Sequence, residues 1–468
     1  MDTSNQKISS HVLLAIIATG IMSFCGVVVE TAMNITFPTL MTQFNISTNT
    51  VQWMTTIYLL IVAIIVPLSA TLQHTFKTKS LFLFANIMFI IGVVLDSVAP
   101  TFPLLILGRM IQGVGTGIAL PLMFNIILEQ VPIHKIGTMM GIGTLITSVA
   151  PAIGPTFGGS VVSSIGWRYI FISLLPLLVI SLILGIFNIE QKSKLTHQKF
   201  DFISFIFIII GLTGLIFGTS NLGNSPFISI NIAGAFAIGL VGIILFVWRS
   251  SKIDNPIIDV AIFKNLNFSG HVIAFFAIQM VLLGLAFLLP NYIQLVNHGT
   301  AILAGLVILP AALIGALFAP LGGRILDRYG AKFPLIFGSS VILLALLILF
   351  LSGTKLSDLA IGSLHFLFMI GIGLNLGNIM TNGLKQVDNS LNAHGNAVLN
   401  TIQQFAGAVG TSASAALVAS KQTSDVTLAH GTALGTHLAF TFLLVGIVIE
   451  LIVIIKVVVF PFKNKETK

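Results

Sequence analysis

Charged residues are scarce in this sequence. Only 8% of its 468 residues are Asp, Glu, Lys or Arg, and 56% are hydrophobic, whereas soluble domains contain about 25% charged residues. So little charge cannot cover a water-exposed surface, which excludes an ordinary soluble domain. The single cysteine, Cys25, also excludes an intrachain disulfide. We therefore expect an all-α integral membrane protein.

Motifs for catalysis and cofactor binding are missing as well. The sequence has no Walker-type phosphate loop, no Cys-x-x-Cys, no Gly-x-Ser-x-Gly elbow and no His, Cys and carboxylate cluster at metal-binding spacing. We expect no enzymatic activity, no metal and no cofactor, and without a phosphate loop we expect no ATP-driven step within this chain. The net charge of +8 is explained by membrane topology rather than by nucleic-acid binding.

Long apolar runs fill most of the chain. A bilayer-spanning helix needs about 20 apolar residues, and fourteen such runs are present. They lie at 12–35, 51–72, 80–98, 103–128, 136–162, 168–188, 202–220, 227–248, 268–290, 302–326, 333–352, 358–384, 394–419 and 436–459. An even number puts both termini on one side, and 18 of the 22 Lys and Arg residues fall on that side. The positive-inside rule makes this side the cytoplasm, so we expect a multi-pass protein of the plasma membrane.

A weak internal repeat divides the chain. The segments 67–79 and 320–332 carry Pro, an aliphatic residue and Lys at matching positions, 253 residues apart. Transporters are often built from such repeats. The offset predicts a 6 + 2 + 6 arrangement, with one half at 1–188, two inserted helices at 189–267 and a second half at 268–468.

The first apolar run contains an acid, Glu30. Placing an acidic side chain at the centre of a spanning helix costs about 2.5–3.5 kcal/mol, so such residues are functional by default. Ser23, Gly26, Met33 and Asn34 share its helical face. We interpret Glu30 as a proton-coupling residue; the alternative is a structural pairing with a neighbouring helix.

A buried base follows in the fourth run. Arg109 shares a face with Gln112 and Thr116, and both Glu30 and Arg109 lie roughly 8 to 9 Å from the outer boundary, counted at 1.5 Å per residue. We expect the two charges to neutralise each other until a proton reaches Glu30. The alternative is a permanent ion pair that only fixes packing.

Two segments suggest movement. In the fifth run, Gly154 and Gly158 have small-xxx-small spacing, and Pro155 and Gly159 add pliability, so we expect a conformational seam there. After the tenth run, we expect a loop over 323–332. Its residues Gly323, Asp327 and Arg328 would form a cytoplasmic latch, with Asp327 capping the next helix or pairing with a basic residue. The alternative is plain positive-inside topology.

Polar residues mark a candidate substrate cavity. Amides recur at helical spacing in the twelfth and thirteenth runs. Together with residues near Glu30, the candidate cavity set is Met33, Asn34, Gln112, Asn375, Asn378, Asn400 and Gln403. Hydrogen bonding between helices is the alternative for these amides. Glu450 is interpreted as the only other acid deep in an apolar run, and as one that reaches toward the membrane surface.

Several motifs resemble those of a known family. Arg109-x-x-Gln-Gly-x-Gly, Gly154-Pro155-x-x-Gly158-Gly159 and Gly323-x-x-x-Asp327-Arg-x-Gly330 are similar to motifs of the major facilitator superfamily. Glu30-Thr-x-x-Asn34-x-x-x-Pro38, with fourteen runs, resembles its fourteen-span drug:proton antiporter branch, in which the acid often stands at the position of Val29. The resemblance implies proton-driven export by alternating access.

The expected function is therefore multidrug efflux. With Glu30 as the only coupled acid, one proton would be exchanged per cycle, which favours neutral or monocationic hydrophobic compounds. We expect a monomer whose partners are drugs, protons and the lipid bilayer. A proton-coupled importer, an exporter or flippase of lipid-like metabolites, and a channel are the alternatives.

Overall fold

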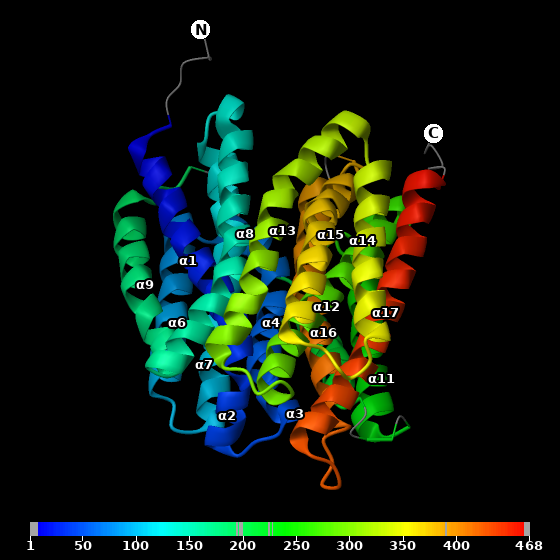
Figure 1. The fold of residues 1–468 in the computed structure, drawn as a ribbon. Coiled ribbons are helices and arrows are strands. Elements are labelled where there is room, and N and C mark those ends of the chain that lie inside the picture. Colours follow the sequence, from blue (N-terminus) through cyan, green and yellow to red (C-terminus); the bar gives the residue numbers. More distant parts are fainter. Residues whose placement is uncertain are drawn as a thin grey trace.

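The structure is a computed structural model. It describes residues 8–192, 195, 200–222, 225–226, 228–388 and 391–462, apart from the side chains of residues 70, 74, 133–134, 137–138, 141, 144–145, 147–148 and 393. Every regular element in these ranges is a helix, and the long helices run side by side as one bundle (Figure 1).

The long helices follow the predicted apolar runs closely. They are α1 (Ser10–Ile35), α4 (Trp53–Ile65), α6 (Thr78–Val98), α7 (Phe102–Gln130), α8 (Ile133–Ser164), α9 (Arg168–Asn188), α10 (Phe202–Ser220), α11 (Ala235–Ser250), α12 (Leu266–Leu295), α13 (Ala301–Tyr329), α14 (Lys332–Leu351), α15 (Asp358–Leu384), α16 (Asn392–Ala419) and α17 (Leu428–Val459). The short ones are α2 (Phe37–Phe44), α3 (Thr48–Val51), η2 (Val66–Leu68), α5 (Ser69–Thr75), η3 (Ile230–Gly234) and η4 (Val260–Lys264).

Twelve stretches in the described residues are long and apolar enough to cross a membrane. Continuous helix is the expected form because lipid offers no partners for backbone polar groups. The prediction of fourteen spans is not confirmed by this criterion, since α8 and α16 are not among the twelve. Both are nevertheless long helices, of 32 and 28 residues, packed inside the bundle.

The helices pack as two sets and a pair. The N-terminal set consists of α1, α4, α6, α7, α8 and α9; α1 contacts α7, α8 and α9, and α7 contacts α4 and α6. The C-terminal set consists of α12 to α17; α12 contacts α15, α16 and α17, and α13 and α14 both contact α15. The pair α10 and α11 pack on each other, and α10 also contacts α4 of one set and α16 of the other. The domain boundaries at residues 188 and 267 stay predictions.

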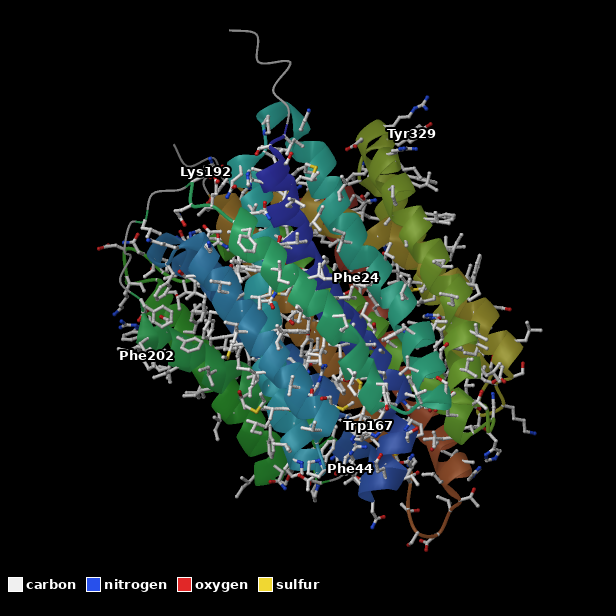
Figure 2. All side chains as sticks on the ribbon, turned by 90° about the vertical axis from the view of Figure 1, so that its left-hand side faces the viewer. Phe24, Phe44, Trp167, Lys192, Phe202 and Tyr329 are labelled. Carbon is white, nitrogen blue, oxygen red and sulfur yellow. The ribbon has the colours of Figure 1, made fainter. Side chains whose placement is uncertain are left out.

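The bundle has two distinct ends. The start of α1 and the finish of α17 lie at one end, here called the terminal end, and α2 and α3 lie at the opposite end, here called the α2–α3 end (Figure 1). Figure 2 places Lys192 and Tyr329 toward the terminal end, and Phe44 and Trp167 toward the α2–α3 end. Phe44 and Trp167 meet there edge to face, with ring centroids 6.1 Å apart.

Side-chain hydrogen bonds join the two sets at the α2–α3 end. They link Thr48 to Gln422 at 2.6 Å, Thr56 and Gln52 to Ser412 at 3.0 and 3.2 Å, Gln294 to the Ile35 carbonyl at 3.1 Å, Thr156 to the Gly305 carbonyl at 3.1 Å, and the Ile302 amide to Ser163 at 3.2 Å. Within the described residues, no side-chain hydrogen bond joins these two sets at the terminal end. The sets are therefore fastened together at one end of the bundle.

The predicted loop at 323–332 is largely helical, which corrects the sequence interpretation. Helix α13 continues to Tyr329, and the chain turns at Gly330, whose φ of +76° favours glycine. Helix α14 begins two residues later, after Ala331, without a side-chain cap. Asp327 therefore does not cap the next helix.

Candidate functional site

Glu30 lies in α1 among helices of the N-terminal set. Its side chain is nearly buried, with 9% exposed, and the neighbouring Val29 is fully packed into the core. Within the described residues Glu30 makes no side-chain hydrogen bond or ion pair, and Arg109 is the charged group that acts on it. Glu30 is therefore an acid whose proton is not held by a fixed acceptor.

Arg109 of α7 is fully buried and held by several groups. Its Nε donates to the Met54 carbonyl at 3.1 Å, and its Nη1 donates to Gln112 Oε1 at 2.6 Å. The guanidinium also lies over the ring of Tyr58, 4.1 Å from the centroid. These contacts draw on the fork of donors that distinguishes Arg from Lys.

Glu30 and Arg109 interact electrostatically but form no direct ion pair, so the alternative of a fixed pair does not hold in this structure. The Nε and Nη1 donors of Arg109 are directed at Met54 of α4 and at Gln112 along α7, so Arg109 acts on Glu30 through its electric field rather than by contact. Equal depth in the bundle fixes the height of two side chains but not the direction in which each points.

Tyr58 ties this site together. Its hydroxyl donates to the Gly26 carbonyl at 2.9 Å and contacts Thr116 at 2.8 Å, so it links α1, α4 and α7. Gly26 lies one turn before Glu30 on the same face, as the helical spacing predicts. Tyr58 thus sets the position of the α1 segment that carries the acid.

A second acid, Asp96 of α6, belongs to the same network and was missed from the sequence. Its carboxylate accepts a 2.7 Å hydrogen bond from Gln112 Nε2, and its side chain is fully buried. Asp96 stands near the end of the apolar run 80–98, which makes it look like a boundary residue. The usual interpretation of an acid inside a span as functional would have identified it.

Several predicted cavity residues are instead buried and make contacts inside the bundle. Asn34 accepts from Thr55 at 2.9 Å, and Met33 is fully buried. Gln112 bridges Arg109 and Asp96, and the Asn378 amide donates to its own helix at the Leu374 carbonyl. In this conformation Asn34 and Gln112 link helices, which was the alternative interpretation, whereas Asn378 bonds within α15. A role of these residues in binding substrate stays a prediction.

Asn375 and Glu450 lie in another buried network, in the C-terminal set. Asn375 donates to Ser339 at 2.8 Å, and Ser339 donates to Glu450 Oε1 at 2.7 Å, joining α15, α14 and α17. Both Asn375 and Glu450 are fully buried. This corrects two interpretations, because Asn375 faces no open cavity and Glu450 does not reach the membrane surface.

Asn400 and Gln403 of α16 are the partly open members of the predicted cavity set. Both are half-buried, and Asn400 bonds only within its own helix, to Asn396 at 2.9 and 3.1 Å. Their side chains are therefore partly accessible, although the Asn400 amide nitrogen is engaged with Asn396 in this conformation.

The predicted seam residues lie between three helices. Gly154 and Gly158 of α8 face Thr31 and Ala32 of α1, and a Cβ at Gly158 would come within 2.6 Å of the Ala32 carbonyl. Gly159 faces the other set, where a Cβ would overlap the Ala301 carbonyl of α13. Helix α8 thus contacts both sets through positions without a side chain, which permits close approach.

The predicted latch residues are open in this structure. Asp327 and Arg328 are exposed at the terminal end of α13, and neither makes an ion pair with a described residue. Gly323 borders open space. The guanidinium of Arg328 lies over Tyr329 at 5.3 Å.

Comparison with curated sequences shows close relatives along nearly the whole chain. The chain is 36% identical to the lincomycin resistance protein LmrB of Listeria monocytogenes over 430 residues, covering 92% of this chain and 91% of that protein. It is 38% identical to LmrB of Bacillus subtilis over 403 residues, covering 85% and 84%. The multidrug resistance protein Stp of Mycobacterium tuberculosis (strain CDC 1551 / Oshkosh) is 26% identical over 363 residues, covering 77% and 66%.

Solved structures share the fold at low identity. A bacterial homologue of the human lysosomal transporter Spinster, in an inward-facing and unoccupied conformation, matches with a TM-score of 0.69 and 14% identity, covering 98% of this chain and 99% of that one. The D-xylose-proton symporter matches with a TM-score of 0.65 and 14% identity, covering 94% and 96%. The family model of the Major Facilitator Superfamily matches residues 19–411. The chain belongs to the major facilitator superfamily, and it is a multi-pass membrane transporter rather than an enzyme.

Proposed function

We propose that this transporter exports drug-like small molecules across the plasma membrane in exchange for protons. Relatives that share 36% to 38% of its residues along most of both chains are named as lincomycin resistance proteins, which supports a drug as substrate. The proton gradient would supply the energy.

The environment of Glu30 carries the proposal. An acid that is nearly buried, lacks a hydrogen-bonded partner in the described residues and lies in the field of Arg109 can change its charge with little rearrangement. Protonation removes the cost of a buried charge, and deprotonation restores it. One proton moving down 100 mV contributes about 2.3 kcal/mol, enough to bias the cycle roughly fifty-fold.

Alternating access would use the two helix sets. We take the α2–α3 end as external and the terminal end as cytoplasmic, so that this conformation is closed toward the outside. The cross-set hydrogen bonds at the α2–α3 end support a closed external side. Protonation of Glu30 from the outside would permit this closure, and drug binding from the inside would favour release of the proton.

Fourteen membrane crossings suit this arrangement. Helices α8 and α16 are long, and each packs within one set while touching the other set. Counting both as spans gives two six-helix halves, with α10 and α11 inserted between them and both termini in the cytoplasm. Gly154, Pro155, Gly158 and Gly159 would form the sliding seam, and Asp327 and Arg328 would latch the cytoplasmic side when it closes.

The substrate would be a hydrophobic compound with no charge or one positive charge. Asn400 and Gln403 offer neutral hydrogen-bonding groups, and the exchange of one proton leaves little driving force for a dication. An exporter or flippase of lipid-like metabolites and a proton-coupled importer are the alternatives.

Purified protein in proteoliposomes tests the proposal. Addition of lincomycin to the wild type should release protons and collapse a preformed pH gradient, and Glu30→Gln should abolish both effects while still folding. Glu190→Gln is the matched control, because that acid is 56% exposed at the far end of α9. Proton release that persists unchanged in Glu30→Gln would contradict the assigned role of Glu30, and a wild type that releases none would contradict proton exchange itself.

A further inference from the structure

Asp96 is a buried acid that the proposed exchange does not use. Its Oδ2 accepts from Gln112, while its Oδ1 has no hydrogen-bond partner although it is fully enclosed. A buried carboxylate is expensive unless a positive charge compensates it. An ionised Asp96 therefore needs a positive charge nearby, and the packing of α6 against α7 supplies one.

Asp96 is pressed against α7 at a point that only glycine allows. A Cβ at Gly108 would overlap the Asp96 carboxylate, and a Cβ at Gly92 of α6 would meet the Gly108 carbonyl at 2.6 Å. This close approach brings Asp96 beside the turn of α7 that holds Arg109 and Gln112. The position of the acid is thus built into the crossing of the two helices.

Gln112 connects the acid to the base. Its Oε1 accepts from Arg109 Nη1 at 2.6 Å, and its Nε2 donates to Asp96 Oδ2 at 2.7 Å. The Gln112 amide is thus hydrogen-bonded to both charged groups. In surroundings of low dielectric, the hydrogen bonds of such a chain polarise and strengthen one another.

Three charges then share one site. Arg109 acts electrostatically on Glu30 and on Asp96, and in the described residues no other charged group acts on either acid. From the remaining packed elements, the titratable neighbours are Tyr58 of α4 and Cys25 of α1, both neutral as phenol and thiol. With Asp96 ionised, protonation of Glu30 takes the site from a net charge of −1 to 0.

We propose that Asp96 is the standing counter-ion of Arg109, a positioning residue that leaves Glu30 free to gain and lose the transported proton. The inference rests on the proposed exchange. Without Asp96, protonation of Glu30 would leave Arg109 buried as an uncompensated charge, so Glu30 would hold on to its negative charge more strongly. Burial favours the neutral form of a carboxyl group, and in this proposal the field of Arg109 and the hydrogen bond from Gln112 outweigh burial at Asp96. Asp96 then stays ionised through the cycle, so one proton per cycle is retained.

Asp96→Asn tests this directly, because asparagine keeps an acceptor for Gln112 and removes only the charge. The pH at which drug-dependent proton release is half-maximal should fall by about 1 unit in this variant. Gln112→Met, which removes the bridge and leaves both charges, should move that midpoint in the same direction by less. Both variants are first checked for a thermal transition like that of the wild type.

Glu450→Gln is the matched control, since it neutralises another fully buried acid that lies in the C-terminal set, away from Arg109. Its midpoint should equal that of the wild type. Unchanged midpoints in both Asp96→Asn and Gln112→Met, with wild-type proton release intact, would overturn the role of Asp96 alone. Loss of proton release in the wild type would instead overturn the proposed exchange.

Discussion

Two charged side chains of this transporter, Arg109 and Asp201, are each held by several groups at once. Arg109 is fixed by a carbonyl, an amide and an aromatic ring. The pair α10 and α11 is joined in a similar way, because Arg249 Nε donates to both oxygens of Asp201 at 2.9 and 3.1 Å and Ser204 donates to the same carboxylate. Partial burial acts to raise the pKa of Asp201, but the hydrogen bonds from Ser204 and Arg249 hold it below its ordinary value.

The Asp201 contacts predict a pH-dependent stability. A lowered pKa in the folded state means that the carboxylate stabilises the fold above the unfolded pKa, about 3.9, and that this contribution is lost as the pH falls through the folded value. Asp201→Asn should lower the melting temperature by about 2 °C at pH 7, since such partly exposed pairs contribute about 1 kcal/mol at most. The difference should shrink as the pH falls below about 3.9 and vanish below the folded pKa.

Thermal unfolding at pH 7 and over this acidic range measures this effect. Glu190→Gln removes an ion pair whose side chains are both more than half exposed, and it should leave the melting temperature unchanged. Equal melting temperatures of wild type and Asp201→Asn at pH 7 would show that Asp201 does not stabilise the pair.

At the scale of elements, the contact of α8 with α13 decides how the two sets meet. Gly159 lies against the Ala301 carbonyl, and Gly305 of α13 lies against Pro155 of α8 in return. Each helix thus places a glycine where the backbone of the other approaches. A surface made of backbone rather than interlocked side chains can slide with a small change in packing.

Gly159→Ala should therefore disfavour the conformation seen here. The added methyl group overlaps the Ala301 carbonyl, and overpacking of this kind costs about 1–3 kcal/mol, which shifts a two-state population roughly 5- to 150-fold. Spin labels at Thr42 of α2 and at Asp425 beyond α16, both exposed, should report a larger separation.

Gly377→Ala is the control for that experiment. It adds the same methyl group to α15, where a Cβ meets nothing within 4 Å. Distance distributions that coincide for Gly159→Ala and the wild type would mean that the seam tolerates a side chain and does not set the conformation.

At the scale of the whole molecule, side-chain hydrogen bonds fasten the two helix sets at the α2–α3 end, and the described residues form none between the sets at the terminal end. Transport by alternating access requires these bonds to break and re-form in each cycle. The hydrogen bond between Thr48 and Gln422 joins the two sets through residues that are 374 positions apart in the sequence.

A cross-link at this position should stop transport. In the double variant Thr48→Cys and Gln422→Cys, oxidation to a disulfide should join the two sets and reduce drug export at least about tenfold, and reduction of the disulfide should restore export. The native Cys25 is replaced by Ser in every variant, so that the introduced cysteines are the only thiols. Each single cysteine variant is the control, and full transport by the cross-linked protein would contradict movement at this end.

The sequence by itself determined the helices, the family and two of the three charges at the site. Uniform apolarity leaves helix as the only stable backbone in lipid, which is why the predicted runs and the observed helices largely agree. The larger differences are at the start of α17, at the start of α11, where η3 precedes it, and at the end of α4, where η2 and α5 follow it. Glu30 and Arg109 are conspicuous for the same reason, because a charge inside an apolar run is costly.

Only the tertiary structure decided which side chains meet. Helical spacing gives the face on which a residue lies but not the neighbour that this face receives, so the same amide pattern produced a bridge at Gln112, a buried network at Asn375 and a half-open surface at Asn400. Asp96 became part of the site because glycines let α6 and α7 approach closely. That approach is a property of two helices packed together, and no single segment specifies it.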